Sequence, residues 1–78
     1  MESEIRDILR ASGNIDGIDR LGPSDDLFEN GMSSFHAVQV MMAIEDRYDI
    51  QFTDDLMKKT TFSTLASLLE AVRRLSAA

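Results

Sequence analysis

Apolar residues recur at helical spacing in three segments of the chain. In residues 3 to about 12, Ile5, Ile8 and Leu9 fall on one face, and Gly13 followed by Asn14 supplies a stop signal. The strongest pattern covers residues 34 to about 48. The last segment runs from about residue 63 to residue 75, with apolar positions at Leu65, Leu68, Leu69, Val72 and Leu75. Each segment is predicted to be an amphipathic helix.

The stretch DIQFTDDLMKK, which follows the second segment, predicts a turn and a further, short helix. This helix is expected to open at Thr53 or Asp54, with acidic residues in its first turn and lysines in its last. The sequence has no alternating strand pattern and no internal repeat. We therefore predict one all-α domain over residues 1–78, a four-helix bundle with a short third helix and a long loop between helices 1 and 2.

That long connection, from Asn14 to Met32, has a distinct composition. It contains three glycines, the only proline and five acidic residues. A connection of this length is unusual in a compact domain unless it is held or used. Its apolar residues predict that it is fastened onto the core: Ile15, Ile18, Leu21, Leu27 and Phe28.

Apolar positions cover more than half the circumference of the helix predicted over residues 34–48. One row contains Phe35, Val38, Met42 and Glu45, and another contains Val40, Ile44 and Tyr48. A helix of this kind either lies centrally in a bundle or presents apolar residues to a partner.

Four methionines lie on or near this helix: Met32, Met41, Met42 and Met57. The simplest interpretation makes them core filler, and for Met42 we expect that role. Methionine side chains also adapt to surfaces that bind several partners, or to a cavity that shelters variable cargo. The sequence leaves both interpretations open.

Charge is unevenly distributed along the 78 residues. The net charge is −6; residues 1–57 contain thirteen acidic residues against four arginines, a balance of −9, whereas residues 58–78 have a balance of +3. An acidic surface repels the phosphate backbone, so nucleic acid is not an expected partner. Basic surfaces on other proteins are favoured instead, although charge also simply keeps a small domain in solution.

The location of the protein is inferred from what the sequence lacks. The amino terminus is charged and amphipathic, and no apolar run is long enough to span a bilayer. The chain has no cysteine and therefore no disulfide or thiol site. We expect a soluble cytoplasmic monomer that does not enter membranes.

Few residues offer catalytic or metal chemistry. His36 is the only histidine, and a histidine without a second ligand beside it does not form a metal site. The segment around Asp16 and Gly17 resembles a calcium loop but lacks its bidentate glutamate. Ser34 and His36 lie two positions apart and do not face each other on a helix. We predict neither a metal site nor an enzyme.

Two adjacent serines precede the strongest helix. Ser33 fits the N-cap, a role that stabilises a helix by about 1 kcal/mol. Ser34 then occupies the first helical position, where its hydroxyl points outward. A phosphate ester at this position lies against the positive end of the helix dipole and free backbone N–H groups. The geometry therefore suits a phosphorylated or phosphopantetheinylated serine.

The order DLFENGMSSFHAVQVMMAIEDRYDIQF resembles the acyl and peptidyl carrier proteins. Their hallmark is a loop ending in Gly-x-Asp-Ser-Leu before a helix that ends in acids and an aromatic residue. Residues 31–35 occupy those five places, and Leu27 with Phe28 matches the apolar pair that pins the loop. DLMKKTTFSTLASLLEAV resembles the short third helix and the fourth, so the likeness spans nearly the whole chain.

This resemblance implies that Ser34 carries 4′-phosphopantetheine, transferred from coenzyme A by a phosphopantetheinyl transferase. The prosthetic thiol then holds an acyl cargo as a thioester, while a loading ligase and downstream acyl-transfer enzymes do the chemistry. The docking surface implied by the family consists of the second helix, the loop before it and the third helix. It maps onto Met32, Ser33, Phe35, His36, Gln39, Met41, Glu45, Asp46, Asp54 and Asp55.

The departures from the family pattern indicate a specialised carrier. Ser33 replaces the usual aspartate, Phe35 replaces the usual leucine, and His36 and Gln39 stand where fatty-acid carriers commonly have acids. The pattern G-x-S-S-F-x-x-V-Q-x-M is similar to stand-alone bacterial carriers that synthetase-like ligases load with small amino acids. The resemblance therefore favours glycine or alanine as cargo. The alternatives are a specialised acyl carrier of fatty acid or polyketide synthesis, and an unmodified helical interaction module.

Overall fold

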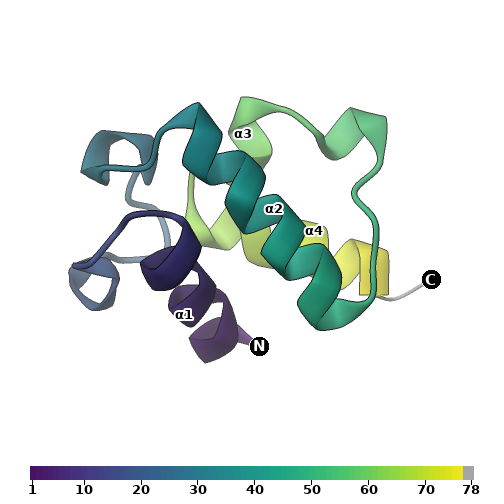
Figure 1. The fold of residues 1–78 in the computed structure, drawn as a ribbon, viewed down its shortest axis with the longest axis horizontal. Coiled ribbons are helices and arrows are strands. Elements are labelled where there is room, and N and C mark those ends of the chain that lie inside the picture. The colour runs from purple at the N-terminus through teal and green to yellow at the C-terminus, as the bar shows by residue number, and fades with distance from the viewer. Residues whose placement is uncertain (77–78) are drawn as a thin grey trace.

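Residues 1–76 are described by the structure, a computed structural model, and within them the chain forms four α-helices and three short 3₁₀ helices. The α-helices are α1 (Glu2–Ser12), α2 (Ser34–Tyr48), α3 (Lys59–Phe62) and α4 (Leu65–Ser76). The 3₁₀ helices are η1 (Ile18–Arg20), η2 (Phe28–Asn30) and η3 (Asp54–Leu56). Figure 1 shows α2 running across the molecule, with α1 on one side and α3 near its amino-terminal end. The predicted all-α bundle is confirmed.

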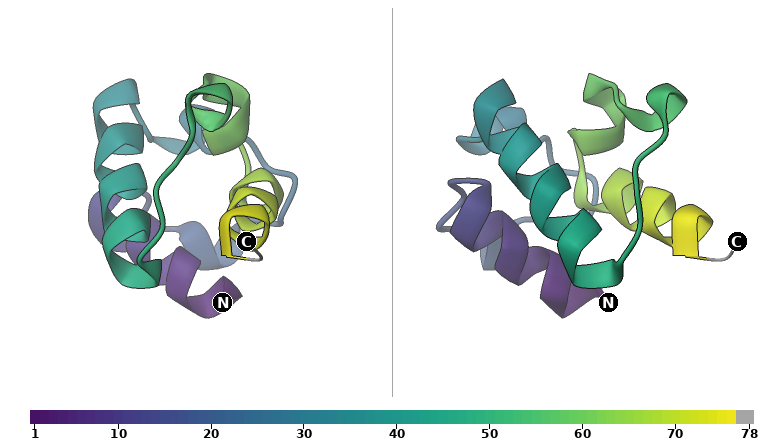
Figure 2. Two further views of the ribbon diagram at one scale, coloured as in Figure 1. Left: turned by 90° about the vertical axis from the view of Figure 1, so that its right-hand side faces the viewer. Right: turned by 45° about the vertical axis from the view of Figure 1, so that its right-hand side comes forward.

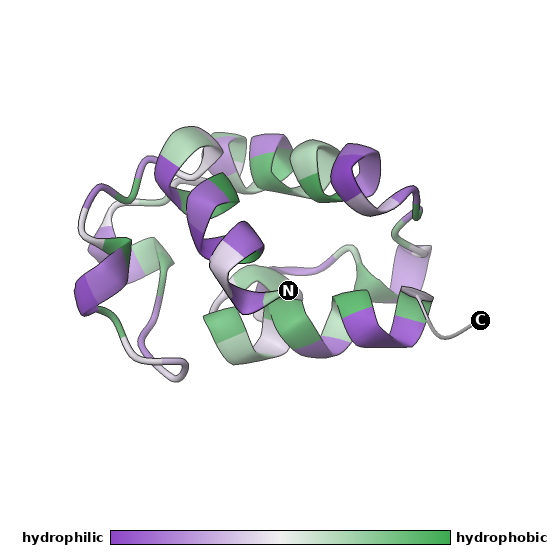
Figure 3. Ribbon diagram, turned by 90° about the horizontal axis from the view of Figure 1, so that it is seen from below, coloured by the Kyte–Doolittle hydropathy of each residue, from purple (hydrophilic) through white to green (hydrophobic). Residues whose placement is uncertain are grey.

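Within the described part of the chain, one apolar cluster lies between the helices. The amphipathic patterns of α1 and α4 turn one face of each helix inward, and Figure 3 shows hydrophobic and hydrophilic residues alternating along the helix that leads to the C-terminus. Side chains that are less than a tenth exposed include Ile5, Leu9, Ile15, Ile18, Leu27, Met32, Val40, Ile44, Phe52, Phe62, Leu65, Leu68, Leu69 and Val72. Residues of the long connection thus enter the core, as predicted.

None of the helices in residues 1–76 is both long and apolar enough to cross a membrane.

The ends of α1 and α2 agree with the prediction, because local capping signals mark them. The backbone N–H of Gly13 donates to the carbonyl of Leu9 at 2.9 Å, and Asn14 follows with a φ of 61°. At the end of α2, Asp49 adopts a left-handed conformation and its N–H donates to the carbonyl of Glu45. Both are C-terminal capping arrangements that satisfy orphan carbonyls.

The prediction for the third helix was wrong in position. Asp54 opens only the 3₁₀ turn η3. The next two residues leave the helical conformation: Met57 has φ −85° and ψ 64°, and Lys58 has φ −140° and ψ 160°. The α-helix α3 begins afterwards, at Lys59, and α4 begins at residue 65 rather than 63. Figure 2 shows the long segment between α2 and α3 crossing from one end of the molecule to the other.

Candidate functional site

The two serines before α2 have different roles. Ser33 is the N-cap: its Oγ accepts a hydrogen bond from the backbone N–H of His36 at 3.2 Å. In return, the backbone N–H of Ser33 donates to Nδ1 of His36 at 3.2 Å, and its Oγ lies 2.8 Å from the same nitrogen. This is a capping box in which histidine replaces the usual Glu or Gln. The predicted cap is confirmed, and His36 has a structural partner that the sequence did not reveal.

Ser34 is the first residue of α2, and its side chain is exposed. Within residues 1–76 its hydroxyl has no hydrogen-bond partner, whereas the hydroxyl of Ser33 is held by the capping box. The positive end of the α2 dipole lies at Ser34, which favours an anionic group there. Ser34 is therefore the serine of the pair whose oxygen is available for attachment.

The loop before the serines is held by hydrogen bonds of its own and by Asn14, which follows the end of α1. Gly31 has a φ of 117°, a conformation that favours glycine, and its carbonyl accepts a hydrogen bond from the amide of Asn14 at 3.2 Å. The N–H of Met32 donates to the carbonyl of Leu27 at 3.2 Å. Met32 is only 2% exposed, so it anchors the loop and its predicted role as a docking contact is wrong.

A second connection joins this loop to the α3–α4 junction. The N–H of Leu27 donates to the carbonyl of Ser63 at 2.7 Å, and the N–H of Ala66 donates to the carbonyl of Pro23 at 3.0 Å. Oδ1 of Asp26 accepts hydrogen bonds from the first two N–H groups of η2, those of Phe28 at 2.8 Å and Glu29 at 3.1 Å. Segments far apart in the sequence therefore fix the position of Ser34 together.

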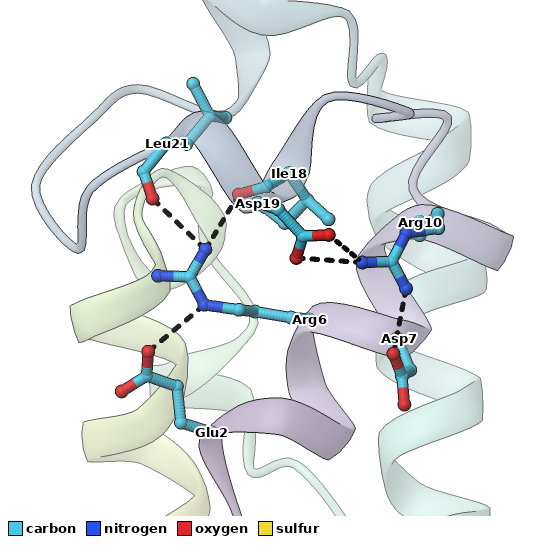
Figure 4. Close-up of polar contacts among 7 residues, drawn as sticks. All are labelled: Glu2, Arg6, Asp7, Arg10, Ile18, Asp19 and Leu21. Carbon is cyan, nitrogen blue, oxygen red and sulfur yellow. Dashed lines mark hydrogen bonds and ion pairs between the residues drawn. The ribbon is translucent and has the colours of Figure 1, made fainter.

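Arginines of α1 secure the first half of the long connection (Figure 4). Nη1 of Arg6 donates to the carbonyls of Ile18 at 2.7 Å and Leu21 at 3.1 Å, and Nε donates to Glu2 at 3.1 Å. Arg10 bonds Asp19 through one terminal nitrogen. The fastening that the sequence predicted from apolar residues thus also has a polar component.

A groove opens beside Ser34, between the start of α2 and the segment around α3. We call it the Ser34 groove; its volume is about 300 Å³, and it is lined by Phe28, Ser34, Ala37, Val38, Met41, Met57, Lys58, Lys59 and Phe62. Its walls are largely apolar. Nζ of Lys59 lies 5.0 Å from the centroid of the Phe28 ring, a cation–π distance. The sequence did not single out the two lysines or Val38 as site residues, because the groove forms only when distant segments meet.

An apolar row on α2 is left uncovered by the other residues of the range 1–76. Phe35 is 68% exposed, Val38 49% and Met42 55%, and Met57 beside the groove is 51% exposed. The expectation that Met42 fills the core was therefore wrong. Exposed apolar residues that gather in this way mark interaction surfaces. The row Phe35–Val38–Met42 was visible in the sequence, but its direction was not.

The remaining predicted docking residues differ in their surroundings. Gln39, Asp46, Asp54 and Asp55 are exposed, and Met41 is partly buried in the Ser34 groove. Glu45 is half-buried, and its Oε2 accepts the N–H of Phe52 at 2.9 Å. Its carboxylate therefore has a structural function that the sequence did not indicate.

The carboxyl group of Asp55, one of the predicted docking residues, has a lowered pKa. A hydrogen bond from Thr53 is the main cause that lowers the pKa of Asp55, with smaller contributions that include the charges of Arg74 and Lys58. Asp55 therefore stays ionised at lower pH than an ordinary aspartate.

In residues 1–76, no group of three or more His, Cys, Asp or Glu side chains is arranged to hold a metal ion.

Residues 3–72 match the family described as "Phosphopantetheine attachment site". The chain belongs to this family of carrier proteins. The family resemblance found in the sequence is thereby confirmed, and the prosthetic group of these carriers is 4′-phosphopantetheine.

Relatives and solved structures agree with this assignment. An aminoacyl carrier protein of Agrobacterium fabrum is 34% identical over 74 residues, which cover 94% of this chain and 89% of the relative. A carrier protein from Agrobacterium tumefaciens, solved with an engineered Bradyrhizobium japonicum glycine:[carrier protein] ligase and AMP, has a TM-score of 0.89 and 34% identity, covering 94% of this chain and 99% of that one. A holo acyl carrier protein from Nitrosomonas europaea has a TM-score of 0.86 and 29% identity, covering 99% and 96%.

The residues of this carrier fit the prosthetic group. Attachment requires a free hydroxyl, and Ser34 provides one at the positive end of a 15-residue helix. A phosphodiester there carries a negative charge, which the helix end stabilises. The arm would leave the serine beside the Ser34 groove, whose walls are apolar and whose rim has two lysines.

Proposed function

We propose that Ser34 carries 4′-phosphopantetheine and that this carrier holds an aminoacyl group on it as a thioester. One observation carries the choice of residue: the Ser33 hydroxyl is held in the capping box, whereas the exposed Ser34 hydroxyl has no partner within residues 1–76. Ser34 supplies its hydroxyl oxygen and gives up the hydroxyl proton when a phosphopantetheinyl transferase forms the phosphodiester. The pyrophosphate bond of coenzyme A breaks in this step, and adenosine 3′,5′-bisphosphate leaves.

The chain's own residues place the attachment point and leave the reaction to partner enzymes. The cap formed by Ser33 and His36 fixes the first turn of α2, and the bonds at Gly31 and Leu27 fix the loop before it. When bound, the prosthetic group supplies a thiol, which a chain without cysteine lacks. A loading ligase and downstream acyl-transfer enzymes then act on the cargo, and the apolar row Phe35–Val38–Met42 beside Ser34 offers them a contact surface.

The preference for an amino acid cargo has two supports. One is the 34% identical aminoacyl carrier protein of Agrobacterium fabrum. The other is the carrier from Agrobacterium tumefaciens, which was solved with a glycine:[carrier protein] ligase. We propose glycine or alanine as cargo and a ligase of this kind as the loading partner. A specialised acyl carrier is the second candidate, favoured by the likeness to the holo acyl carrier protein of Nitrosomonas europaea.

Attachment is tested by intact mass after incubation with coenzyme A, Mg²⁺ and a broad-specificity phosphopantetheinyl transferase. The parent chain and Ser33→Ala are expected to gain one phosphopantetheine, and Ser34→Ala none. Modification of Ser34→Ala would overturn the assignment. If no chain is modified, Ser33→Asp tests whether the transferase requires the aspartate of the family pattern, and failure of that variant as well would refute attachment at Ser34.

Cargo is tested on the modified chain. The chain is incubated with ATP, a glycine:[carrier protein] ligase and glycine or alanine, and in parallel with an acyl-carrier ligase and fatty acids. A mass gain of one amino acid that hydroxylamine removes supports an aminoacyl thioester. A gain only with fatty acids supports the specialised acyl carrier.

A further inference from the structure

The Ser34 groove combines an apolar interior with a cationic rim. Its apolar walls come from η2, α2 and the α3 segment, and Lys58 and Lys59 lie at the same groove as the Ser34 hydroxyl. Both lysines are exposed. A site of this kind suits a ligand in which an anionic group is followed directly by an apolar segment.

The two ammonium groups are not neutralised by fixed ion pairs. Among the ion pairs found in residues 1–76, none includes Lys58 or Lys59. Lys59 is instead oriented by the Phe28 ring, 5.0 Å away. Acidic side chains near the lysines are Asp54 and Asp55 of η3 and Glu70 of α4, which lines a second pocket together with Lys58. The carboxylate of Asp55 is hydrogen-bonded by Thr53, and the charge of Lys58 makes a smaller contribution to its lowered pKa.

The cationic rim formed by Lys58 and Lys59 directly follows a strongly acidic part of the sequence. Residues 1–57 have a balance of −9, and the first positive charges after them are these two lysines. A mobile anion near Ser34 would therefore be drawn towards α3 rather than along the acidic surface. Because a group bound to Ser34 is tethered beside the groove, its effective concentration there is high.

We propose, resting on the attachment at Ser34, that Lys58 and Lys59 are positioning residues for the phosphopantetheine arm. Their ammonium groups contact the phosphodiester, and this contact lays the adjoining apolar part of the arm along Val38, Met41 and Phe62. The occupant of the Ser34 groove is thus the chain's own prosthetic arm. With a volume of about 300 Å³, the groove is at the small end of ligand pockets and suits a slender occupant.

The experiment uses the full chain in its modified form, with modification verified by intact mass. Isotope-filtered NMR is expected to show contacts between the dimethyl group of the arm and the side chains of Val38, Met41 and Phe62. The rate at which the thiol is alkylated by a maleimide gives a second readout. In the double variant Lys58→Gln/Lys59→Gln, the contacts are expected to weaken and the rate to rise about two- to fivefold, the range for surface charge contacts.

Two further variants distinguish the arm-binding role from a general effect of charge. Arg20→Gln/Arg73→Gln removes the same charge from exposed residues that do not line the groove, and it is expected to behave like the parent. Lys58→Arg/Lys59→Arg is expected to retain the contacts. A modified parent chain without arm contacts would overturn the inference while leaving attachment intact. Equal alkylation rates for Lys58→Gln/Lys59→Gln and Arg20→Gln/Arg73→Gln would overturn it in the same way. Failure of every chain to gain mass would instead overturn the attachment on which it rests.

Discussion

The phenol hydroxyl of Tyr48, at the end of α2, donates a 2.7 Å hydrogen bond to the Glu4 carboxylate on α1. Arg47 pairs with the same carboxylate. The bond from Tyr48 is the largest cause of the lowered pKa of Glu4. Burial, followed by this hydrogen bond, raises the pKa of Tyr48 to about 12. One contact thus joins the two helices and affects the titration of both groups.

This contact predicts a loss of stability at high pH. The raised pKa of Tyr48 means that its contribution is present below the ordinary value of 10.0 and is lost as the pH rises towards about 12. The difference in urea midpoint between the parent and Tyr48→Phe is therefore expected to shrink over that interval. A difference that stays constant up to the raised pKa would contradict the assignment.

The contact between Tyr48 and Glu4 also predicts a loss of stability at low pH. Because the pKa of Glu4 is lowered, its contribution is present above the ordinary value of 4.5 and is lost as the pH falls through the lowered value. Glu4→Gln is expected to be less stable than the parent at neutral pH and to approach it in acid. Urea titrations at several pH values measure this, and Glu2→Gln is a control on the same helix. An equal response of the two variants to acid would argue against a special role for Glu4.

Gly31→Ala is predicted to destabilise the loop that presents Ser34. At a φ of 117° an L side chain is strained, and a Cβ there would lie 3.2 Å from the carbonyl oxygen of Asn14. We expect a loss of about 1–3 kcal/mol in the free energy of unfolding. Gly17→Ala is the matched control, since an added Cβ there meets nothing within 4 Å, and its stability should change little. Equal losses in the two variants would show that the loop does not require this conformation.

Glu45→Ala is predicted to destabilise the fold even in the absence of any partner. It removes the acceptor of the Phe52 N–H at 2.9 Å, and Phe52 is buried. A loss of about 1–2 kcal/mol is expected by chemical denaturation. Asp46→Ala changes the same charge on the exposed neighbouring residue and should have little effect. If the two variants lost the same stability, the hydrogen bond to Phe52 would not be the cause.

The capping box predicts different outcomes for two substitutions at His36. Gln can accept the Ser33 N–H as the histidine ring does, so His36→Gln should retain the cap. His36→Ala should lose about 0.5–1 kcal/mol and shift the amide resonance of Ser33. Urea denaturation and ¹⁵N spectra measure the two effects. A stable alanine variant with an unshifted Ser33 amide would mean that the Ser33 hydroxyl alone caps α2.

Sequence patterns predicted most of the elements because their signals are local. The range 34–48 was predicted correctly for α2, since Ser33 supplies a cap immediately before a long apolar pattern. The third helix was misplaced for the opposite reason. The acidic pair Asp54 and Asp55 is a good helix start, but the chain turns after η3, and burial of Thr61 and Phe62 sets where α3 forms.

In the candidate site too, features with a local signal could be predicted from the sequence, and features that depend on tertiary packing could not. Ser34 could be chosen from the sequence because its signal is the order of adjacent residues. The groove beside it could not, because Phe28, Met41 and Lys59 come from three separate segments that only tertiary packing brings together. The exchange of expected roles between Met32 and Met42 has the same origin, since periodicity identifies an apolar position but not the direction in which it faces.

The connections around the serine loop also make the surroundings of Ser34, the proposed attachment point, depend on the folded state. The bond from Asn14 to Gly31 and the bond from Leu27 to Ser63 hold this loop between the segment that follows α1 and the junction of α3 and α4. An unfolded chain contains the same serine but lacks the helix end and the fixed loop. An enzyme that recognises this geometry would therefore modify native molecules in preference to damaged ones. Attachment at Ser34 would then favour those carriers that have completed folding.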